Sequence, residues 1–202
     1  MNRTDLSGLV ASRICHDLIS PVGAISNGLE LLAMAPSGSA EETALIRQSA
    51  DAATASLKFM RIAFGAPGFE DMMAQTDVAH ILSAYLNQGR RTANWQVTGT
   101  GMSRADAQIL FLAALSLADA APIGGALRVE ECSCEPLSLS LVVHAGRIQH
   151  PAPTAPPTPR DAHHVLLAEI AAARRATIEW DVTPAEDIGL KEGYARLTIT
   201  AP

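Results

Sequence analysis

The stretch SRICHDLISPVGAISNGLELL, residues 12–32, decides the fold of the first third of this chain, because its apolar residues recur at helical spacing. On a helix that advances about 100° per residue, one group of apolar side chains lies within roughly 40° of Leu18. This group comprises Ile14, Val22, Ile25, Leu29 and Leu32. His16 lies about 160° from Leu18 on the same wheel. The stretch therefore predicts a long helix that packs its apolar face against other helices and exposes His16.

A proline follows the histidine at a costly place. Pro21 has no amide for the Asp17 carbonyl and its ring crowds that carbonyl, which costs about 3 kcal/mol in an ordinary helix and predicts a bend just after His16-Asp17. A neutral imidazole is a good nucleophile near pH 7, and a neighbouring carboxylate can orient it and stabilise the charge that develops on it. We therefore interpret His16 as a reactive side chain and Asp17 as its adjacent acid.

Several polar or small residues share the predicted face of His16 and are candidates for contact with a partner protein. They are Ser12, Arg13, Ser20, Gly23 and Asn27, although Leu9 and Leu31 also fall on this face. Arg13 is placed to meet a phosphoryl oxygen or an acidic pocket of a partner, and Gly23 leaves room for a partner helix. Lys58 and Arg61 on the following helix extend this candidate surface, although solvated charge is the commoner explanation of such residues.

A second helix follows after a short turn. Pro36 and Gly38 end the first helix near Met34, and Ser39-Ala-Glu-Glu42 is a capping box for a helix that runs to about Phe64. Its expected buried residues are Leu45, Ile46, Ala53, Met60 and Phe64. Two long helices joined by a short turn form an antiparallel hairpin, which cannot surround its own apolar face. We therefore expect a homodimer that pairs two hairpins into a four-helix bundle.

Gly65-Ala-Pro-Gly68 marks the boundary between a helical domain, residues 1–67, and a second domain, residues 68–202. The second domain is predicted to contain helices at 77–87, 103–120 and 161–175. The helix at 103–120 is expected to be amphipathic, and Asp77 and Asp161 are expected to cap the other two. Strands are predicted at 95–98, 126–131, 137–144, 177–182 and 194–200. The proline-rich residues 151–159 are expected to be an extended surface connector. This pattern predicts an α+β fold whose second domain is an α/β sandwich with a largely antiparallel sheet.

Composition limits the possible partners. The chain has 202 residues, of which 48% are hydrophobic, and a formal net charge of -6. It has no Lys/Arg run of the kind that binds nucleic acid or a membrane surface. The absence of an 18-residue apolar run and of an apolar signal segment predicts a cytoplasmic protein, whose three cysteines are then reduced thiols. Adjacent helical side chains point about 100° apart, so His163 and His164 are a poor chelating pair and we expect no metal site.

The motif HDLISP, residues 16–21, resembles the His-Glu/Asp-Leu-x-x-Pro motif in the phosphorylated helix of bacterial histidine kinases. The wider run of residues 12–32 is still more similar to the ChpT-type histidine phosphotransferases of alphaproteobacterial phosphorelays. The resemblance covers the whole chain. It implies that the hairpin dimerises as in a kinase and that the second domain keeps the ATP-binding fold without binding ATP. It also implies that His16 is the phosphorylated residue and Asp17 its adjacent acid.

The residues of the second domain agree with lost nucleotide binding. Leu112 and Ser116 stand where a kinase has magnesium-binding asparagines, and His144-Ala-Gly-Arg147 replaces the adenine-binding Asp-x-Gly-x-Gly turn. The resemblance therefore implies that this chain binds no cofactor. His16 would accept a phosphoryl group from the receiver domain of a hybrid histidine kinase and pass it to the receiver of a response regulator, with Mg²⁺ on the receiver.

Two other functions stay open at this point. One is a non-catalytic dimeric adaptor that binds or sequesters receiver domains. The other is an ATP-dependent histidine kinase with unusual nucleotide-binding motifs. Label on His16 from a phosphorylated receiver separates the first of these from a phosphotransferase, and titration with nucleotide and Mg²⁺ tests the second.

Overall fold

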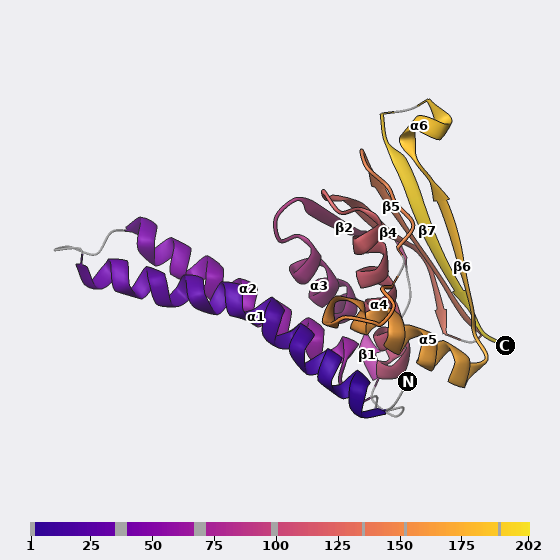
Figure 1. The fold of residues 1–202 in the computed structure, drawn as a ribbon, viewed down its shortest axis with the longest axis horizontal. Helices are drawn as coiled ribbons and strands as arrows, with labels where there is room; N and C mark the ends of the chain where they lie inside the picture. The colour runs from indigo at the N-terminus through magenta and orange to yellow at the C-terminus, as the bar shows by residue number, and fades with distance from the viewer. Residues whose placement is uncertain are drawn as a thin grey trace.

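A long helical hairpin extends from a mixed α/β body (Figure 1). The computed structural model describes residues 3–34, 40–66, 72–97, 101–134, 136–151, 153–189 and 191–202. The hairpin consists of α1 (Arg3–Met34) and α2 (Ala40–Ala63). Both helices agree with the prediction from the sequence, and α1 runs through Pro21 as one element. The capping residue predicted for α2, Ser39, lies outside the described residues.

The body contains the remaining elements. Its helices are α3 (Gln75–Leu86), α4 (Arg104–Ala120), the short η1 (Pro159–Asp161), α5 (Ala162–Arg174) and α6 (Ala185–Ile188). Its strands are β1 (Met72–Ala74), β2 (Arg91–Trp95), β3 (Gly101–Ser103), β4 (Gly125–Cys134), β5 (Leu137–Ala145), β6 (Thr177–Thr183) and β7 (Gly193–Thr200). The predicted boundary between residues 67 and 68 lies outside the described residues and stays a prediction.

The main sheet has five strands in the order β2-β4-β5-β7-β6. Within the described part of the chain, β2 and β4 pair in parallel and the other neighbours are antiparallel, which confirms the predicted sheet type. Side chains of β5 alternate, so Leu139 and Leu141 are buried and Ser138 and Ser140 are partly exposed. This alternation arises because α4 and α5 cover one face of the sheet (Figure 1). A separate two-stranded sheet joins β1 and β3.

The α4 helix forms the centre of the core. It is predicted from the sequence as an amphipathic helix, but this expectation is wrong, because α4 is buried on nearly all sides. It packs against the sheet and also contacts α2 and α5, so little of its surface remains for solvent. Its start is as predicted, since the Ser103 Oγ accepts a hydrogen bond of 3.1 Å from the Asp106 amide.

The end of α2 is anchored in this core. The Phe59 ring stacks on Tyr85 of α3 and on Phe111 of α4, with ring centroids 4.0 and 4.7 Å apart. The buried Gln108 side chain donates hydrogen bonds to the carbonyls of Ala63 and Gly65, at 3.1 and 2.9 Å. These contacts join the hairpin and the body through the chain that leaves α2.

The structure corrects two predicted capping residues and one strand. Asp77 lies in the first turn of α3, and the N-cap position is Ala74. Asp161 makes no side-chain cap on α5; its carboxylate accepts hydrogen bonds from Thr158 and Thr154 in the preceding loop. The strand predicted at 95–98 instead covers Arg91–Trp95, where parallel pairing with β4 supplies its hydrogen bonds. Local propensity could not show that pairing, because β4 is distant in the sequence.

The apolar face predicted for the hairpin is only partly covered. Of the residues expected to be buried, Val22, Leu29 and Leu45 are 55%, 54% and 58% exposed. The reason is that one partner helix covers only one side of α1: a Cβ at the buried Gly28 would lie 2.6 Å from the Ile46 side chain of α2, while the adjacent side of α1 faces solvent. Among the described helices, none combines the length and the hydropathy that a membrane span requires.

Candidate functional site

His16 lies near the middle of α1 on its solvent side. Its side chain is 65% exposed, whereas that of the neighbouring Asp17 is only 16% exposed. The His16 Nδ1 lies 3.1 Å from the Asp17 Oδ1. A carboxylate can only accept a hydrogen bond, so Nδ1 carries the proton and donates it to Asp17. In the neutral form of the ring, the Nε2 atom is then the unprotonated nitrogen and has a free lone pair.

The second oxygen of Asp17 is also occupied. The Arg13 Nε donates a hydrogen bond of 2.9 Å to the Asp17 Oδ2, one helical turn away. Burial tends to lower the pKa of Arg13, but the Asp17 carboxylate outweighs this effect and the pKa is raised above its ordinary value. Asp17 is therefore held by a permanent positive charge on one side and orients the His16 imidazole on the other.

A pocket of about 330 Å³ opens beside this group of residues. Its lining combines residues of α1 with residues of α2, α3, the turn after α3 and the first residue of β2. They are Arg13, His16, Asp17, Ser20, Ser56, Tyr85, Leu86, Gln88 and Arg91. The pocket is therefore assembled only when the body packs against the hairpin.

Tyr85 presents a protonated hydroxyl to this pocket. Burial, and next the nearby Asp17 carboxylate, raise the pKa of Tyr85 to about 12, although the Arg13 guanidinium acts in the opposite direction. The stacked Phe59 ring lies 4.0 Å from the Tyr85 ring, centroid to centroid. At neutral pH the side chain is thus a neutral hydrogen-bond donor within the same pocket as His16.

The structure brings together part of the set of candidate residues. Arg13, His16, Asp17 and Ser20 line one pocket. The other candidates, Ser12, Gly23, Asn27, Lys58 and Arg61, lie outside its lining. Four of these five are exposed, and a Cβ at Gly23 would meet no described atom within 4 Å, which agrees with space for a partner at that position.

No sequence pattern indicated the other half of the pocket. Ser56, Tyr85, Gln88 and Arg91 come from three separate segments and have no motif in common. Ser56 belongs to α2, which pairs with α1, and the other three come near His16 because α3 and the start of β2 lie beside the hairpin. A regular period within a helix or strand indicates one element at a time, so it could not place them.

The residues predicted to have replaced magnesium ligands lie in the core. Leu112 and Ser116 are both 0% exposed. The Ser116 Oγ donates a hydrogen bond of 3.1 Å to the Leu112 carbonyl within α4. This part of α4 therefore has the character of a core helix.

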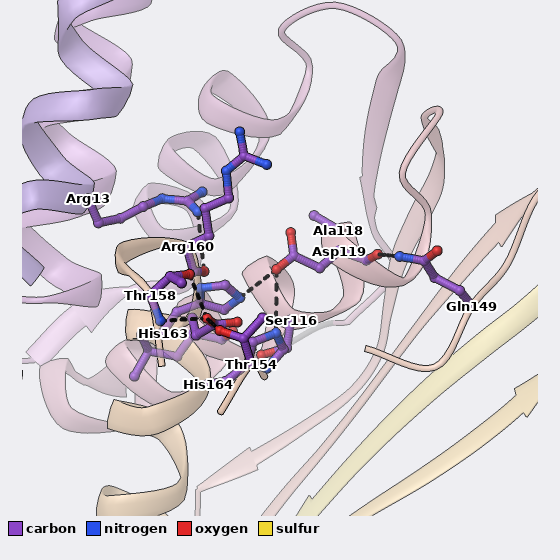
Figure 2. Close-up of polar contacts among 12 residues, drawn as sticks. Arg13, Ser116, Ala118, Asp119, Gln149, Thr154, Thr158, Arg160, His163 and His164 are labelled. Atoms are coloured by element: carbon purple, nitrogen blue, oxygen red, sulfur yellow. Dashed lines mark hydrogen bonds and ion pairs between the residues drawn. The ribbon is translucent and has the colours of Figure 1, made fainter. Parts of the chain in front are cut away.

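A second polar cluster lies where α5 approaches the end of α4 (Figure 2). Nε2 atoms of His163 and His164 lie 3.1 and 3.4 Å from the Asp119 Oδ2. The expectation that these two adjacent histidines diverge is therefore wrong. Their ring centroids are 4.1 Å apart, because both rings turn toward one carboxylate that belongs to a different helix.

Comparison with known proteins supports one family. Residues 75–186 match the family described as "Histidine phosphotransferase C-terminal domain". The "Protein phosphotransferase ChpT" of Brucella abortus (strain 2308) is 37% identical over 208 residues, which cover 92% of this chain and 97% of that protein. A solved bacterial phosphotransferase is 27% identical with a TM-score of 0.81, covering 98% of this chain and 97% of the other.

The histidine kinase domain of the Erythrobacter litoralis EL346 blue-light activated histidine kinase matches at a TM-score of 0.43 and 14% identity, over 98% of this chain and 93% of that one. That level of similarity does not establish a common fold. The family match and the curated relative, by contrast, together extend over the hairpin and the body. This chain therefore belongs to the ChpT-type histidine phosphotransferases and is a protein phosphotransferase of phosphorelays.

Proposed function

We propose that His16 is the residue that carries the phosphoryl group, accepting it from an aspartyl phosphate on one receiver domain and passing it to the aspartate of a second. One observation supports this proposal above the others. His16 is 65% exposed, and its Nδ1 is held by Asp17 at 3.1 Å, so that Nε2 has a free lone pair. We therefore propose Nε2 as the phosphorylated nitrogen.

The transfer step follows from this arrangement. The Nε2 lone pair attacks phosphorus in line with the bond to the receiver carboxylate, an N–P bond forms, and the P–O bond breaks with its electron pair leaving on the carboxylate. The imidazole gains positive charge, which the Asp17 carboxylate stabilises through Nδ1. Passing the group to a second receiver reverses these changes. The Mg²⁺ of the reaction belongs to the receiver in this proposal.

Charged and polar groups around His16 suit a phosphorylated partner. Arg13 and Arg91 line the pocket together with the Tyr85 hydroxyl, and all three are donors for phosphoryl oxygens. The exposed Ser12, Ser20, Asn27, Lys58 and Arg61, with the open space at Gly23, would form the surrounding docking surface. Receiver domains of a hybrid kinase and of a response regulator are the proposed partners.

We propose that the body no longer binds ATP. The support is local: the apolar Leu112 and the internally bonded Ser116 offer no ligand for magnesium. The phosphoryl group would then reach His16 only from another protein. Because a phosphorelay intermediate of this kind works in the cytoplasm, we propose that this chain is cytoplasmic.

We also propose that two chains form a homodimer through the hairpin. One side of α1 carries side chains spaced alternately four and three residues apart, all exposed in the single chain. They are Cys15, Ile19, Val22, Ser26, Leu29 and Ala33. A 3.5-residue period is the pattern that packs helices side by side in a bundle. We call these six residues the α1 stripe, and its burial against a second hairpin would complete a four-helix bundle.

The decisive experiment mixes the full chain with a receiver domain that carries labelled aspartyl phosphate. Acid-labile label should appear on the wild-type chain and be absent from His16→Ala. The matched control is His80→Ala, which removes an exposed histidine of α3 and should leave labelling intact. If the chain binds the receiver but gains no label, it is a non-catalytic adaptor. Label that persists in His16→Ala would refute the proposed site.

A further inference from the structure

The cluster of Asp119, His163 and His164 has no role in the transfer chemistry proposed for His16. Asp119 lies at the end of α4, and the two histidines lie in the first turn of α5 (Figure 2). One ligand-type atom from each of the three side chains lies within 4.8 Å of the other two. The sequence separates Asp119 from the histidines, so the tertiary fold brings these atoms together.

His163 has an unexplained environment. Its side chain is 0% exposed, and among the described residues neither ring nitrogen has a hydrogen-bond partner. The Nε2 lies 3.1 Å from the Asp119 Oδ2, yet this approach does not satisfy hydrogen-bond geometry. Buried polar groups are almost always satisfied, so such an atom requires an explanation. A ligand bound between the His163 Nε2 and the Asp119 carboxylate is an explanation that fits the position of this nitrogen.

The distances fit a shared metal ion. Zinc binds histidine nitrogen and carboxylate oxygen at about 2.0–2.2 Å, with tetrahedral angles. Two such bonds separate their ligand atoms by about 3.3–3.5 Å. The two Nε2 atoms lie 3.1 and 3.4 Å from the Asp119 Oδ2. These two separations are close to that value, and the ligand atoms of all three side chains lie within 4.8 Å of one another.

Access to the cluster comes from a second pocket of about 360 Å³, lined by Asp119 and His164. This pocket provides space for a water molecule as a fourth ligand. Arg13, Arg91 and Arg160 line the same pocket, and their charge opposes a dication, so binding should be weaker than at a zinc site built from four cysteines. We propose that Asp119, His163 and His164 form a Zn²⁺ site with three protein ligands and one water.

The position of the site gives it a structural consequence. A bound ion would fasten α5 to α4, since it takes ligands from both helices. The Arg13 side chain extends from α1 to the Arg160 carbonyl of η1, directly before α5, at 3.4 Å. Zinc would thus rigidify the part of the body that contacts α1 beside the His16 pocket.

The test is a calorimetric titration of the full, chelator-treated chain with Zn²⁺, repeated with Co²⁺, whose visible absorption reports tetrahedral coordination. We expect one ion per chain at this site and a rise in the unfolding temperature on binding. Asp119→Asn and His164→Gln should each weaken binding at least about tenfold. His80→Gln is the control for loss of an exposed histidine, and His16→Gln is the control for zinc capture by the phosphotransfer site. Both should bind as the wild type does.

The variants avoid the fully buried His163, whose loss could prevent folding. Circular dichroism checks each fold, and His164→Gln alone decides the matter if Asp119→Asn does not fold. No measurable binding, binding unchanged in the folded variants, or loss of binding in His16→Gln would each overturn the proposed site. These results do not depend on phosphotransfer, so the proposed function and the zinc site can fail separately.

Discussion

At the scale of single residues, Asp17 connects two of the candidate side chains. One carboxylate oxygen is 3.1 Å from the His16 Nδ1 and the other is 2.9 Å from the Arg13 Nε. The surface of a helix normally leaves a histidine free to rotate, and this bridge restricts both its rotation and its tautomer. The sequence motif predicted that Asp17 accompanies His16. It did not predict that Arg13 also holds Asp17.

Asp17→Asn should therefore slow phosphotransfer while leaving the fold intact. An asparagine cannot provide the charge that stabilises a cationic imidazole, so we expect the rate to fall by on the order of 10²-fold. The rate of label transfer from a phosphorylated receiver measures this effect. Glu30→Gln, an isosteric change on the exposed part of α1, is the control and should transfer normally. An unchanged rate in Asp17→Asn would contradict the orienting role.

Tyr85 allows a prediction about pH. Because its pKa is about 12 in the folded chain against 10.0 for a free tyrosine, its hydroxyl stays protonated throughout the range in which the transfer is assayed. Between pH 10 and 12 the unfolded chain loses this proton and the folded chain does not, so stability falls as pH rises through that window.

Tyr85→Phe should remove this part of the alkaline loss of stability, as measured by urea denaturation between pH 8 and about 11. The same variant keeps the stack on Phe59 and should reduce the transfer rate severalfold without changing its pH profile near neutrality. If wild type and variant lose stability in parallel above pH 10, the buried, protonated hydroxyl is not supported.

At the scale of elements, periodicity predicted the hairpin, α4, and strands β4 to β7 close to their observed bounds, because each has a strong repeat of its own. It failed where tertiary contacts decide the outcome. The α4 helix was expected to have a polar side, yet its polar residues Asp106 and Gln108 are buried and have partners on other elements. The prediction that His163 and His164 point apart was wrong for the same reason, since both rings turn toward Asp119 of α4.

Gln108 should be a strong stabilising residue of the junction between hairpin and body. The Gln108 side-chain amide donates to the carbonyls of Ala63 and Gly65. These carbonyls lie at the end of α2, where the helix has no further backbone amide to donate to them. Gln108→Leu preserves the volume but leaves these acceptors without that donor, so we expect a loss of about 2 kcal/mol in the free energy of unfolding. Gln96→Leu at an exposed position is the control, with an expected change below about 0.5 kcal/mol. Equal midpoints in urea would contradict this account.

At the scale of the whole molecule, the hairpin alone does not make the site. Residues of α1 supply His16, Asp17 and Arg13, while the body supplies Tyr85 and Arg91. The sequence motif predicted the first set, because its members are close along one helix. The second set depends on how two parts of the chain pack, which a single sequence does not encode as a local pattern.

The exposed α1 stripe bears on the oligomeric state of the whole molecule. A single chain leaves Ile19, Val22 and Leu29 of the α1 stripe 73%, 55% and 54% exposed, and a regular row of such side chains on a soluble helix favours burial against a partner. A glutamate at Val22 or Leu29 would be neutralised or desolvated inside that interface and would be harmless on a solvated surface.

We therefore expect the double variant Val22→Glu/Leu29→Glu to sediment as a monomer at concentrations where the wild type is a dimer, with a dissociation constant at least about 10²-fold higher, which corresponds to about 3 kcal/mol. Ile123→Glu, at an apolar residue that is 52% exposed but lies outside the hairpin, should leave the dimer unchanged. Analytical ultracentrifugation over a concentration series gives both constants. An apolar interface cannot bury two carboxylates in each chain without loss of affinity. A double variant that dimerises as tightly as the wild type, or a wild type that is monomeric, would therefore show that the α1 stripe is not a dimer interface.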